Sequence, residues 1–157
     1  MGRIFNSMKE FFASDDWKFQ ELDGKDLHMR YRGDVGTWSC FARAREQEDQ
    51  FVFYSVAPIN TPPERRAAMA EFVTRANYGM IIGNFEMDFN DGEVRYKTSV
   101  DVEGTDLVAP LIRQLVYANV AMMNRYYSGI LSVAFGGGEP AAEVARIEGG
   151  GEAAPAE

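Results

Sequence analysis

The sequence predicts an α+β fold, in which an antiparallel sheet of about five strands is flanked by helices. Two kinds of pattern favour this class. Some segments alternate apolar and polar residues, as half-buried strands do, and others repeat apolar residues every three or four positions, as amphipathic helices do. Glycine, proline and aspartate residues separate these segments. We therefore expect the order α-β-β-β-α-β-β-α, in a chain of 157 residues that is the size of one domain.

The first half of the chain is expected to form a helix followed by strands. Residues 3–13 carry five large apolar side chains at helical spacing: Ile4, Phe5, Met8, Phe11 and Phe12. Residues 19–31 predict a hairpin or a bent strand that turns at Asp23 and Gly24, and residues 38–44 predict a second strand. Residues 51–57 are apolar at both odd and even positions, which predicts a central strand covered on both faces.

A second helix is expected from about residue 61 to residue 78. Thr61 can cap its N-terminus, the two prolines that follow suit a first helical turn, and Gly79 favours an end. Its inward face is expected to carry mostly small residues, which implies that the helix lies close to the sheet. These residues are Ala67, Ala70, Val73, Ala76 and Asn77. Arg65 is expected to stay in water.

Residues 83–102 predict a hairpin with a two-residue loop at Asp91 and Gly92, since glycine tolerates the positive φ that such a loop needs. In that register Glu86 lies opposite Lys97, and Asp88 lies opposite Arg95. One face of the hairpin would then be apolar and the other would carry paired opposite charges.

The last predicted helix spans about residues 106–135 and has an apolar arc wider than one sheet face requires. Part of that arc is therefore expected to meet a second molecule. The candidate partner or dimer residues are Val116, Asn119, Met122, Met123, Tyr126, Tyr127 and Ile130. Methionine and tyrosine suit an adaptable binding surface, and packing in the core is the alternative interpretation.

Residues 1–135 are expected to form the domain, and residues 136–157 a disordered acidic tail rich in glycine, alanine and glutamate. The net charge of −8 argues against nucleic acid or an anionic membrane as a partner. No apolar run approaches the roughly 20 residues of a membrane span. Cys40, the single cysteine, is expected to be a buried, inert thiol, which favours a cytoplasmic protein.

No catalytic or metal-binding constellation is apparent. His28 is the only histidine and has no cysteine near it in the sequence, so neither a zinc site nor a histidine-based triad is expected. We expect no cofactor and no enzymatic activity. The rival hypothesis is a small-ligand-binding protein or an enzyme with a pocket between the sheet and the long helix. Its candidate walls are Trp38, Tyr54, Arg95 and Tyr117.

The central part of the chain resembles the YbjN-domain family, whose members are labelled bacterial sensory transduction regulators. The resemblance covers about residues 10–132 and depends on the apolar strand 51–57, the prolines at 62 and 63, and the motifs EFVTRANYGM at 71–80, GNFEMD at 83–88 and DGEVRY at 91–96. It implies a fold similar to type III secretion chaperones, which are commonly dimers that hold extended segments of client proteins.

The resemblance also implies roles for three residues. Asn77 is expected to cap its helix or to tie it to the hairpin, and Gly83 and Gly92 are expected to be required by the backbone. Together with the apolar arc, it favours a non-enzymatic protein-binding module, chaperone-like or regulatory. Such a module would form a homodimer and act through an apolar face of the sheet or of the C-terminal helix.

Overall fold

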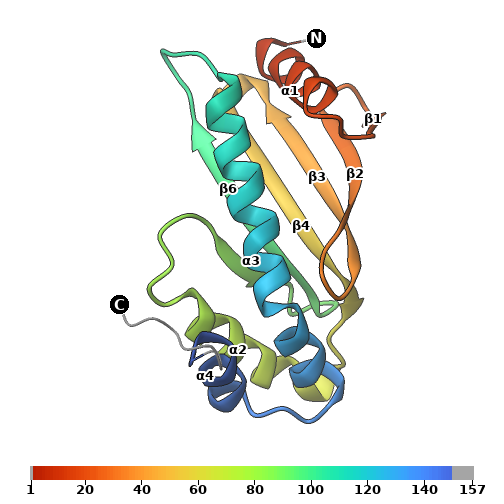
Figure 1. The fold of residues 1–157 in the computed structure, drawn as a ribbon, viewed down its shortest axis with the longest axis vertical. Coiled ribbons are helices and arrows are strands. Elements are labelled where there is room, and N and C mark those ends of the chain that lie inside the picture. Colours follow the sequence, from red (N-terminus) through yellow and green to blue (C-terminus); the bar gives the residue numbers. More distant parts are fainter. Residues whose placement is uncertain (1, 150–157) are drawn as a thin grey trace.

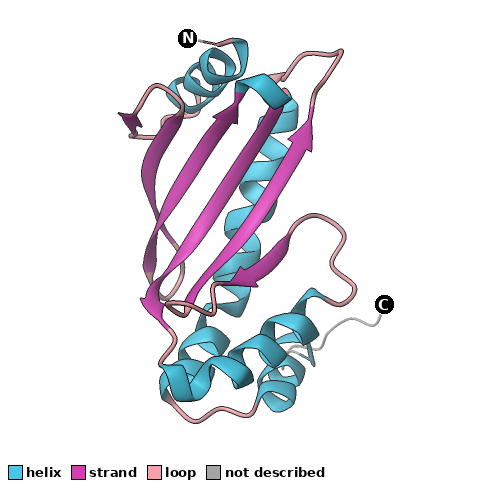
Figure 2. Cartoon of the chain, turned by 180° about the vertical axis from the view of Figure 1, so that it is seen from behind, coloured by secondary structure: helices cyan, strands magenta, loops and turns pink. Residues whose placement is uncertain are grey.

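The computed structural model describes residues 2–149, which form one antiparallel sheet with helices packed on one of its faces. The six strands lie in the order β1-β2-β3-β4-β6-β5. Helices α1 and α3 cover one face of the sheet (Figure 1). Among the described residues, no helix covers the opposite face, as Figure 2 shows. The α+β class expected from the sequence is confirmed.

The sheet has one strand more than the five expected, because the segment around Asp23 and Gly24 folds as a hairpin whose short first arm is β1. Asp23 and Gly24 both have positive φ, 54° and 65°. The elements are α1 (Arg3–Ser14), β1 (Gln20–Leu22), β2 (Asp26–Arg32), β3 (Thr37–Arg45), β4 (Gln50–Asn60), α2 (Arg66–Asn77), β5 (Asn84–Met87), β6 (Glu93–Asp101), α3 (Ala109–Phe135) and α4 (Pro140–Gly149). Short 3-10 turns at Glu46–Glu48 and Pro63–Arg65 precede β4 and α2.

α1 packs on the sheet through the apolar stripe that the sequence predicted, and all five of its large apolar side chains are buried. Its N-terminus is capped by a residue distant in sequence. The carboxylate of Glu46 accepts hydrogen bonds from the backbone N–H groups of Ile4, at 3.2 Å, and Phe5, at 2.8 Å. A negative charge stabilises the positive end of a helix, so Glu46 anchors α1 to the turn before β4.

β4 is central, between β3 and β6, but the prediction that it is covered on both faces is wrong. Phe51 and Phe53 are buried beneath the helices, whereas Tyr54 and Val56 lie half-buried on the open face. Long side chains of the neighbouring strand shield this face in place of a second layer. The guanidinium of Arg95, for example, lies 4.1 Å from the centre of the Tyr54 ring.

α2 begins at Arg66, and Thr61 does not cap it. The Thr61 backbone N–H donates to Gly92 O at 2.8 Å, and its buried hydroxyl has no hydrogen-bond partner among the described residues. Arg65 is half-buried rather than in water: it donates to the carbonyl oxygens of Val133, at 2.7 Å, and Gly138, at 2.6 Å. It thereby satisfies one free carbonyl group in the last turn of α3 and one in the segment that follows the helix.

The buried face of α2 is also larger than the small-residue face that the sequence predicted. Ala67 is exposed, while Met69 and Phe72 are fully buried beside Val73 and Ala76. The difference arises because α2 packs against α3 and α4 as well as against β5, and large side chains fill the space between these elements.

The register of the β5–β6 hairpin differs by two residues from the prediction. Glu86 lies opposite Arg95, and Phe85 lies opposite Tyr96. The loop is longer than expected, because Gly92 N donates to Asp88 O at 2.7 Å. A shift of two residues keeps every side chain on its predicted face. The Glu86 carboxylate contacts both Arg95, at 2.7 Å, and Lys97, at 3.2 Å, whereas Asp88 does not pair with Arg95.

The long helix α3 starts at Ala109, three residues later than expected, and crosses the covered face of the sheet. A buried asparagine holds it there: Asn119 Nδ2 donates to Phe53 O at 2.9 Å and to Tyr96 O at 3.1 Å. The hydroxyl of Thr98 donates to Leu115 O at 3.0 Å. These bonds join α3 to β4 and β6. Within residues 2–149, no helix has the length and apolar content needed to cross a membrane.

The segment expected to be a disordered tail contains a helix. α4 spans Pro140–Gly149 and packs against α2 and α3 (Figure 1). Val144 is buried, and Glu143 accepts a hydrogen bond from Ser132 at 3.0 Å. The apolar pattern of α4 is too weak to predict a helix from the sequence, because the segment is short and rich in alanine. α4 docks on a surface that exists only in the folded chain. Residues 150–157 of the expected tail lie outside the described residues.

Candidate protein-binding groove

Six of the seven candidate partner residues on α3 lie in the core of the folded chain. Val116, Asn119, Met123, Tyr126, Tyr127 and Ile130 are buried, and Met122 is half-buried. Their contacts explain the width of the apolar arc. The ring of Tyr127 packs 5.5 Å from Trp38, and Tyr126 packs edge-on against Phe85 at 5.5 Å. The wide arc of α3 therefore contacts both the sheet and α2.

The walls suggested for a pocket between sheet and helix do not come together. Trp38 is buried beneath α3, whereas Tyr54 and Arg95 stack on each other on the open face of the sheet. Tyr117 lies elsewhere again, with its hydroxyl donating to Asp15 at 2.7 Å.

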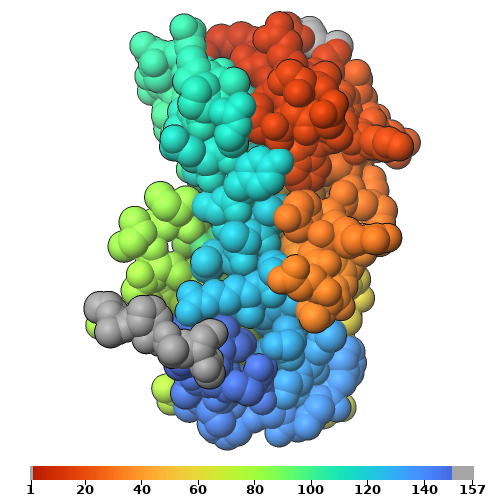
Figure 3. All heavy atoms as spheres, viewed as in Figure 1, coloured from red at the N-terminus to blue at the C-terminus, as the bar shows by residue number. Residues whose placement is uncertain are grey.

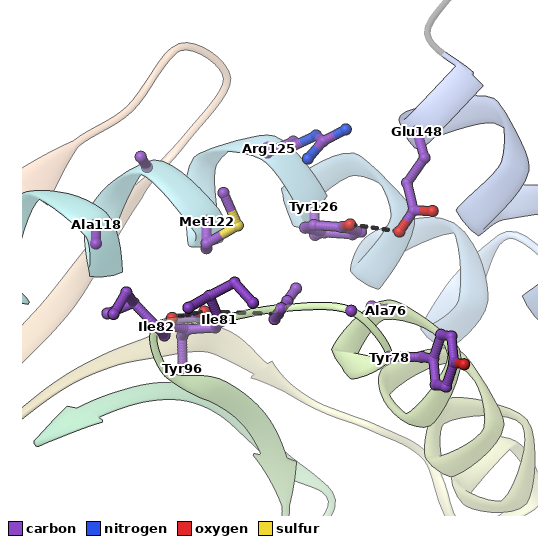
Figure 4. A pocket seen from close by; sticks show the side chains of 13 residues that line it. Ala76, Tyr78, Ile81, Ile82, Tyr96, Ala118, Met122, Arg125, Tyr126 and Glu148 are labelled. Carbon is purple, nitrogen blue, oxygen red and sulfur yellow. Dashed lines mark hydrogen bonds between the residues drawn. The ribbon is translucent and has the colours of Figure 1, made fainter. Parts of the chain in front are cut away.

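The structure instead shows a groove between α3 and the segment that follows α2 (Figure 4). Its volume is about 430 Å³. Ala118, Ala121 and Met122 of α3 form one wall, and Met80 and Ile82 lie across from them. The other lining residues are Ala76, Tyr78, Gly79, Ile81, Tyr96, Arg125, Tyr126 and Glu148. Met122 is thus the one candidate partner residue that reaches this groove without being buried.

The segment of residues 78–82 is held at both ends. At its start, the Asn77 side chain accepts a hydrogen bond from Phe85 N, at 2.7 Å, and donates to Phe85 O, at 3.0 Å. At its end, Gly83 has a φ of 82°, and a Cβ there would collide with the carbonyl oxygen of Lys97. The expected roles of Asn77 and Gly83 are therefore confirmed. Gly92, with a φ of 80°, similarly lies against the backbone of Thr61.

This fixed segment presents large apolar side chains to solvent. Tyr78 is 90% exposed, Ile81 is 88% exposed and Ile82 is 49% exposed. Clustered apolar residues on a surface mark sites of interaction more often than single ones do. Sequence reasoning missed these residues. The signal was a run of apolar residues, Met80 to Ile82, enclosed by Gly79 and Gly83.

Two tyrosine hydroxyls in the lining of the groove are already hydrogen-bonded. The Tyr96 hydroxyl donates to Ile82 O at 2.6 Å, and the Tyr126 hydroxyl donates to Glu148 at 2.7 Å. Burial raises the pKa of Tyr96 to about 12, and burial together with the Glu148 carboxylate raises the pKa of Tyr126. Both phenols therefore remain protonated. The groove offers an apolar surface with Arg125 at its rim, and it holds neither a histidine nor a cysteine.

The chain matches the family model of YbjN, described as "Putative bacterial sensory transduction regulator", over residues 6–132. The chain belongs to the YbjN family. No curated protein matches it. Among solved structures, YbjN from E. coli is similar to it with a TM-score of 0.59 and 11% identity, over 76% of this chain and 84% of that chain.

Two structures that contain chaperones are also similar to this YbjN-family chain. The HopA1–SchA chaperone–effector complex aligns with a TM-score of 0.50 and 12% identity, over 77% of this chain and 91% of that chain. The Yersinia pestis type III secretion chaperone SycH, in complex with a stable fragment of YscM2, aligns with a TM-score of 0.46 and 11% identity, over 74% of this chain and 93% of that chain. The first of these confirms that the fold is chaperone-like.

The two residues with potential chemistry lie apart from the groove of this YbjN-family protein. Cys40 is buried, as expected, and burial raises the pKa of its thiol to about 12, which disfavours the reactive thiolate form. His28 lies on the open face, where its Nε2 is 3.0 Å from the Ser39 hydroxyl and its ring stacks on Phe41. Within residues 2–149, no three of the histidine, cysteine, aspartate and glutamate side chains form a metal-binding group.

Proposed function

We propose that this YbjN-family chain is a non-enzymatic protein-binding module, chaperone-like or regulatory, whose groove receives apolar side chains of a partner protein. The observation that carries the proposal is the exposure of Tyr78 and Ile81 at the mouth of an apolar groove. Water contact with such side chains is unfavourable, and a partner that covers them gains roughly 25 cal/mol for each Å² of apolar surface it buries.

The composition of the groove supports a partner of variable shape. Met80 and Met122 lie on opposite walls, and methionine side chains adapt to different apolar surfaces. The HopA1–SchA structure is a chaperone–effector complex. Because the fold is shared, we propose that the partner of this chain is also a protein. The binding surface is assigned only from the exposed residues of this chain.

The proposal includes a homodimer in the cytoplasm. An exposed side chain beside an apolar groove makes a patch that a second copy can complement, since the same patch on two subunits forms a two-fold interface. The buried free thiol of Cys40 supports a reducing compartment. Sedimentation velocity distinguishes a partner protein from a second copy of this chain as the occupant of the groove. If wild type is a dimer and the Ile81→Asp variant is a monomer, the groove holds a second copy.

The test compares capture of proteins from native lysate by three forms of the folded chain: wild type, Ile81→Asp and Phe89→Asp. Phe89 is 60% exposed in the β5–β6 loop, away from the groove, and serves as the matched control. We expect one protein to be retained by wild type and Phe89→Asp and lost by Ile81→Asp. That protein, purified, should bind wild type at least tenfold more tightly than Ile81→Asp. Equal binding to all three forms would remove the groove from the proposal.

A small apolar ligand is a second candidate occupant. A volume of about 430 Å³ lies within the range of ligand pockets, and the hydroxyls of Tyr96 and Tyr126 lie among its lining residues. A thermal shift measured against a panel of metabolites separates the two functions, because only a molecule that binds the folded state raises the melting temperature. A saturable rise of several degrees that is lost in Met122→Asp would favour the small ligand.

A further inference from the structure

The outer edge of β2 is only partly covered. β1 pairs with β2 along three positions, from Asp26 to His28, while β2 itself continues to Arg32. Beyond His28, no strand of the described residues lies outside β2, which forms the margin of the sheet below β1 in Figure 2. An unpaired edge is a template for another strand, and proteins usually block it with charge, proline or a covering loop.

The backbone groups that face outward belong to Arg30 and Arg32. Lys25 and Gly33 direct their backbone groups toward β3: Ala44 N donates to Lys25 O at 2.8 Å, and Gly33 N donates to Gly36 O at 2.7 Å. Because this direction alternates along an antiparallel strand, the even-numbered residues face the edge. The N–H and C=O groups of Arg30 and Arg32 have no hydrogen-bond partner among the described residues.

A groove of about 740 Å³ runs along this edge. Residues 15–20, which lead from α1 into β1, form one side of it, and residues 28–32 form the other. Figure 3 shows the N-terminal residues in red directly above those of β2 and its neighbours in orange on this side of the molecule. The groove is therefore bordered by the N-terminal segment and by the unpaired strand edge.

The two sides of the sheet offer different chemistry to a strand placed there. Toward the helices, Trp17 stacks on Tyr31 with ring centres 5.8 Å apart, and Tyr117 lies 6.1 Å from Trp17. Toward the open face, the side chains of Arg30 and Arg32 are exposed and form no ion pair with a described residue. The aromatic side also holds the carboxylate of Asp15, which accepts hydrogen bonds from Trp17 Nε1, at 3.0 Å, and from the Tyr117 hydroxyl, at 2.7 Å. The open side is cationic, in a chain whose net charge is −8.

We propose that the edge of β2 binds an extended segment of a partner protein, which adds a strand in line with β1 and antiparallel to β2. The backbone of that segment pairs with the N–H and C=O groups of Arg30 and Arg32. Side chains in directly opposed positions lie on the same face of a sheet. The segment therefore places acidic residues opposite Arg30 and Arg32, and apolar residues between them against Tyr31 and Trp17.

The partner chemistry is thus an alternation of apolar and acidic residues over about five positions. The proposal rests on the proposed function in one respect, that the chain binds proteins, and it places the contact at the opposite edge of the sheet from the groove beside α3. The two surfaces share no lining residue. A variant of one groove is therefore a control for the other.

The test uses fluorescein-labelled synthetic peptides and fluorescence anisotropy with the full chain. One group of peptides alternates Val or Phe with Asp or Glu, a second replaces the acids by Lys, and a third has the composition of the first in non-alternating order. We expect saturable binding of the first group alone, weakening as salt is raised. Hydrogen exchange at the Arg30 and Arg32 amides should slow when the peptide is bound.

Two variants of β2 separate backbone pairing from charge. Arg30→Pro removes an outward-facing N–H and leaves the bonds to β3, since proline is tolerated on an edge strand. It should weaken the acidic peptides at least tenfold. The double variant Arg30→Glu, Arg32→Glu should lose the acidic peptides and gain the Lys-containing ones, which a misfolded chain would not do. Ile81→Asp should bind the peptides as wild type does, even if it loses the partner of the other groove.

Absence of saturable binding by every alternating peptide would overturn the proposal, as would equal binding of the alternating and non-alternating orders. Unchanged affinity in a folded Arg30→Pro variant would show that the edge backbone is not paired. If the peptides bind as expected while Ile81→Asp keeps every lysate partner, the strand-edge site stands and the groove beside α3 is removed from the proposed function.

Discussion

Asn77 shows how one side chain can replace a neighbouring strand. β5 is an edge strand, and its outward-facing backbone N–H and C=O at Phe85 both bond to the carboxamide of Asn77. The carboxamide has the same donor and acceptor as a peptide group, so it satisfies this position as a strand would. One edge of the sheet is closed at Phe85, whereas the other remains open at Arg30 and Arg32.

Replacing Asn77 by alanine should therefore lower the free energy of unfolding by about 1–3 kcal/mol, because it leaves the N–H of Phe85 without a partner. It also removes one of the two donors to the Phe85 carbonyl, which then keeps only the side chain of Asn84. Chemical denaturation with urea measures the change. Thr74→Ala, on the exposed side of the same helix, is the matched control and should alter stability by less than about 0.5 kcal/mol. A loss no larger than that of the control would mean that water replaces the carboxamide.

At the scale of elements, α4 completes the packing of two other helices. Val144 is buried against them, and the carboxylate of Glu148 accepts a hydrogen bond from the hydroxyl of Tyr126 on α3. α4 also contributes Glu148 to the lining of the groove beside α3. The C-terminal helix thus affects both the stability of the α2–α3 pair and the shape of the candidate binding site.

Val144→Asp should destabilise the chain by about 2–4 kcal/mol, because it removes a buried apolar side chain and places a charge without a partner in its position. Urea denaturation measures the difference, with Ala145→Asp on the exposed side of α4 as the control. If both variants have the stability of wild type, α4 is not docked in solution.

Two buried groups, the Cys40 thiol and the Tyr96 phenol, make the stability of the whole molecule depend on pH in the alkaline range. Burial raises the pKa of Cys40 from 9.0 to about 12 and that of Tyr96 from 10.0 to about 12. Above pH 9 the unfolded chain releases these protons while the folded chain retains them. The stability is therefore fully present below the unfolded pKa values and decreases as the pH rises from about 9 toward 12.

We expect the free energy of unfolding to fall between pH 9 and pH 11, and to fall less steeply in Cys40→Ser, whose hydroxyl does not titrate there. Denaturation curves at several pH values measure the two slopes, and the slopes between pH 6 and pH 8 serve as the internal control. Parallel slopes above pH 9 would show that the Cys40 thiol titrates alike in the folded and unfolded chain.

Local pattern alone was enough to predict most of the elements. The five apolar residues of α1, the alternation in β3 and the glycine and proline positions depend on neighbours in sequence, and each was placed correctly within a few residues. Where a loop had two solutions, as at Asp88–Gly92, the pattern predicted the faces of the strands but not the register. The faces follow from alternation, whereas the register follows from hydrogen bonds within the loop.

The sequence by itself determined the fold class, the family and the absence of recognisable catalytic motifs, because these depend on residue type and spacing. Only the tertiary structure decided which apolar residues face a partner. Met123 and Tyr127 match Met122 in character, yet they are buried and Met122 lines a groove. Tyr78 and Ile81 are exposed, although tyrosine and isoleucine also occur in the core of this chain. Burial depends on what packs against a side chain, and that is set by elements distant in sequence.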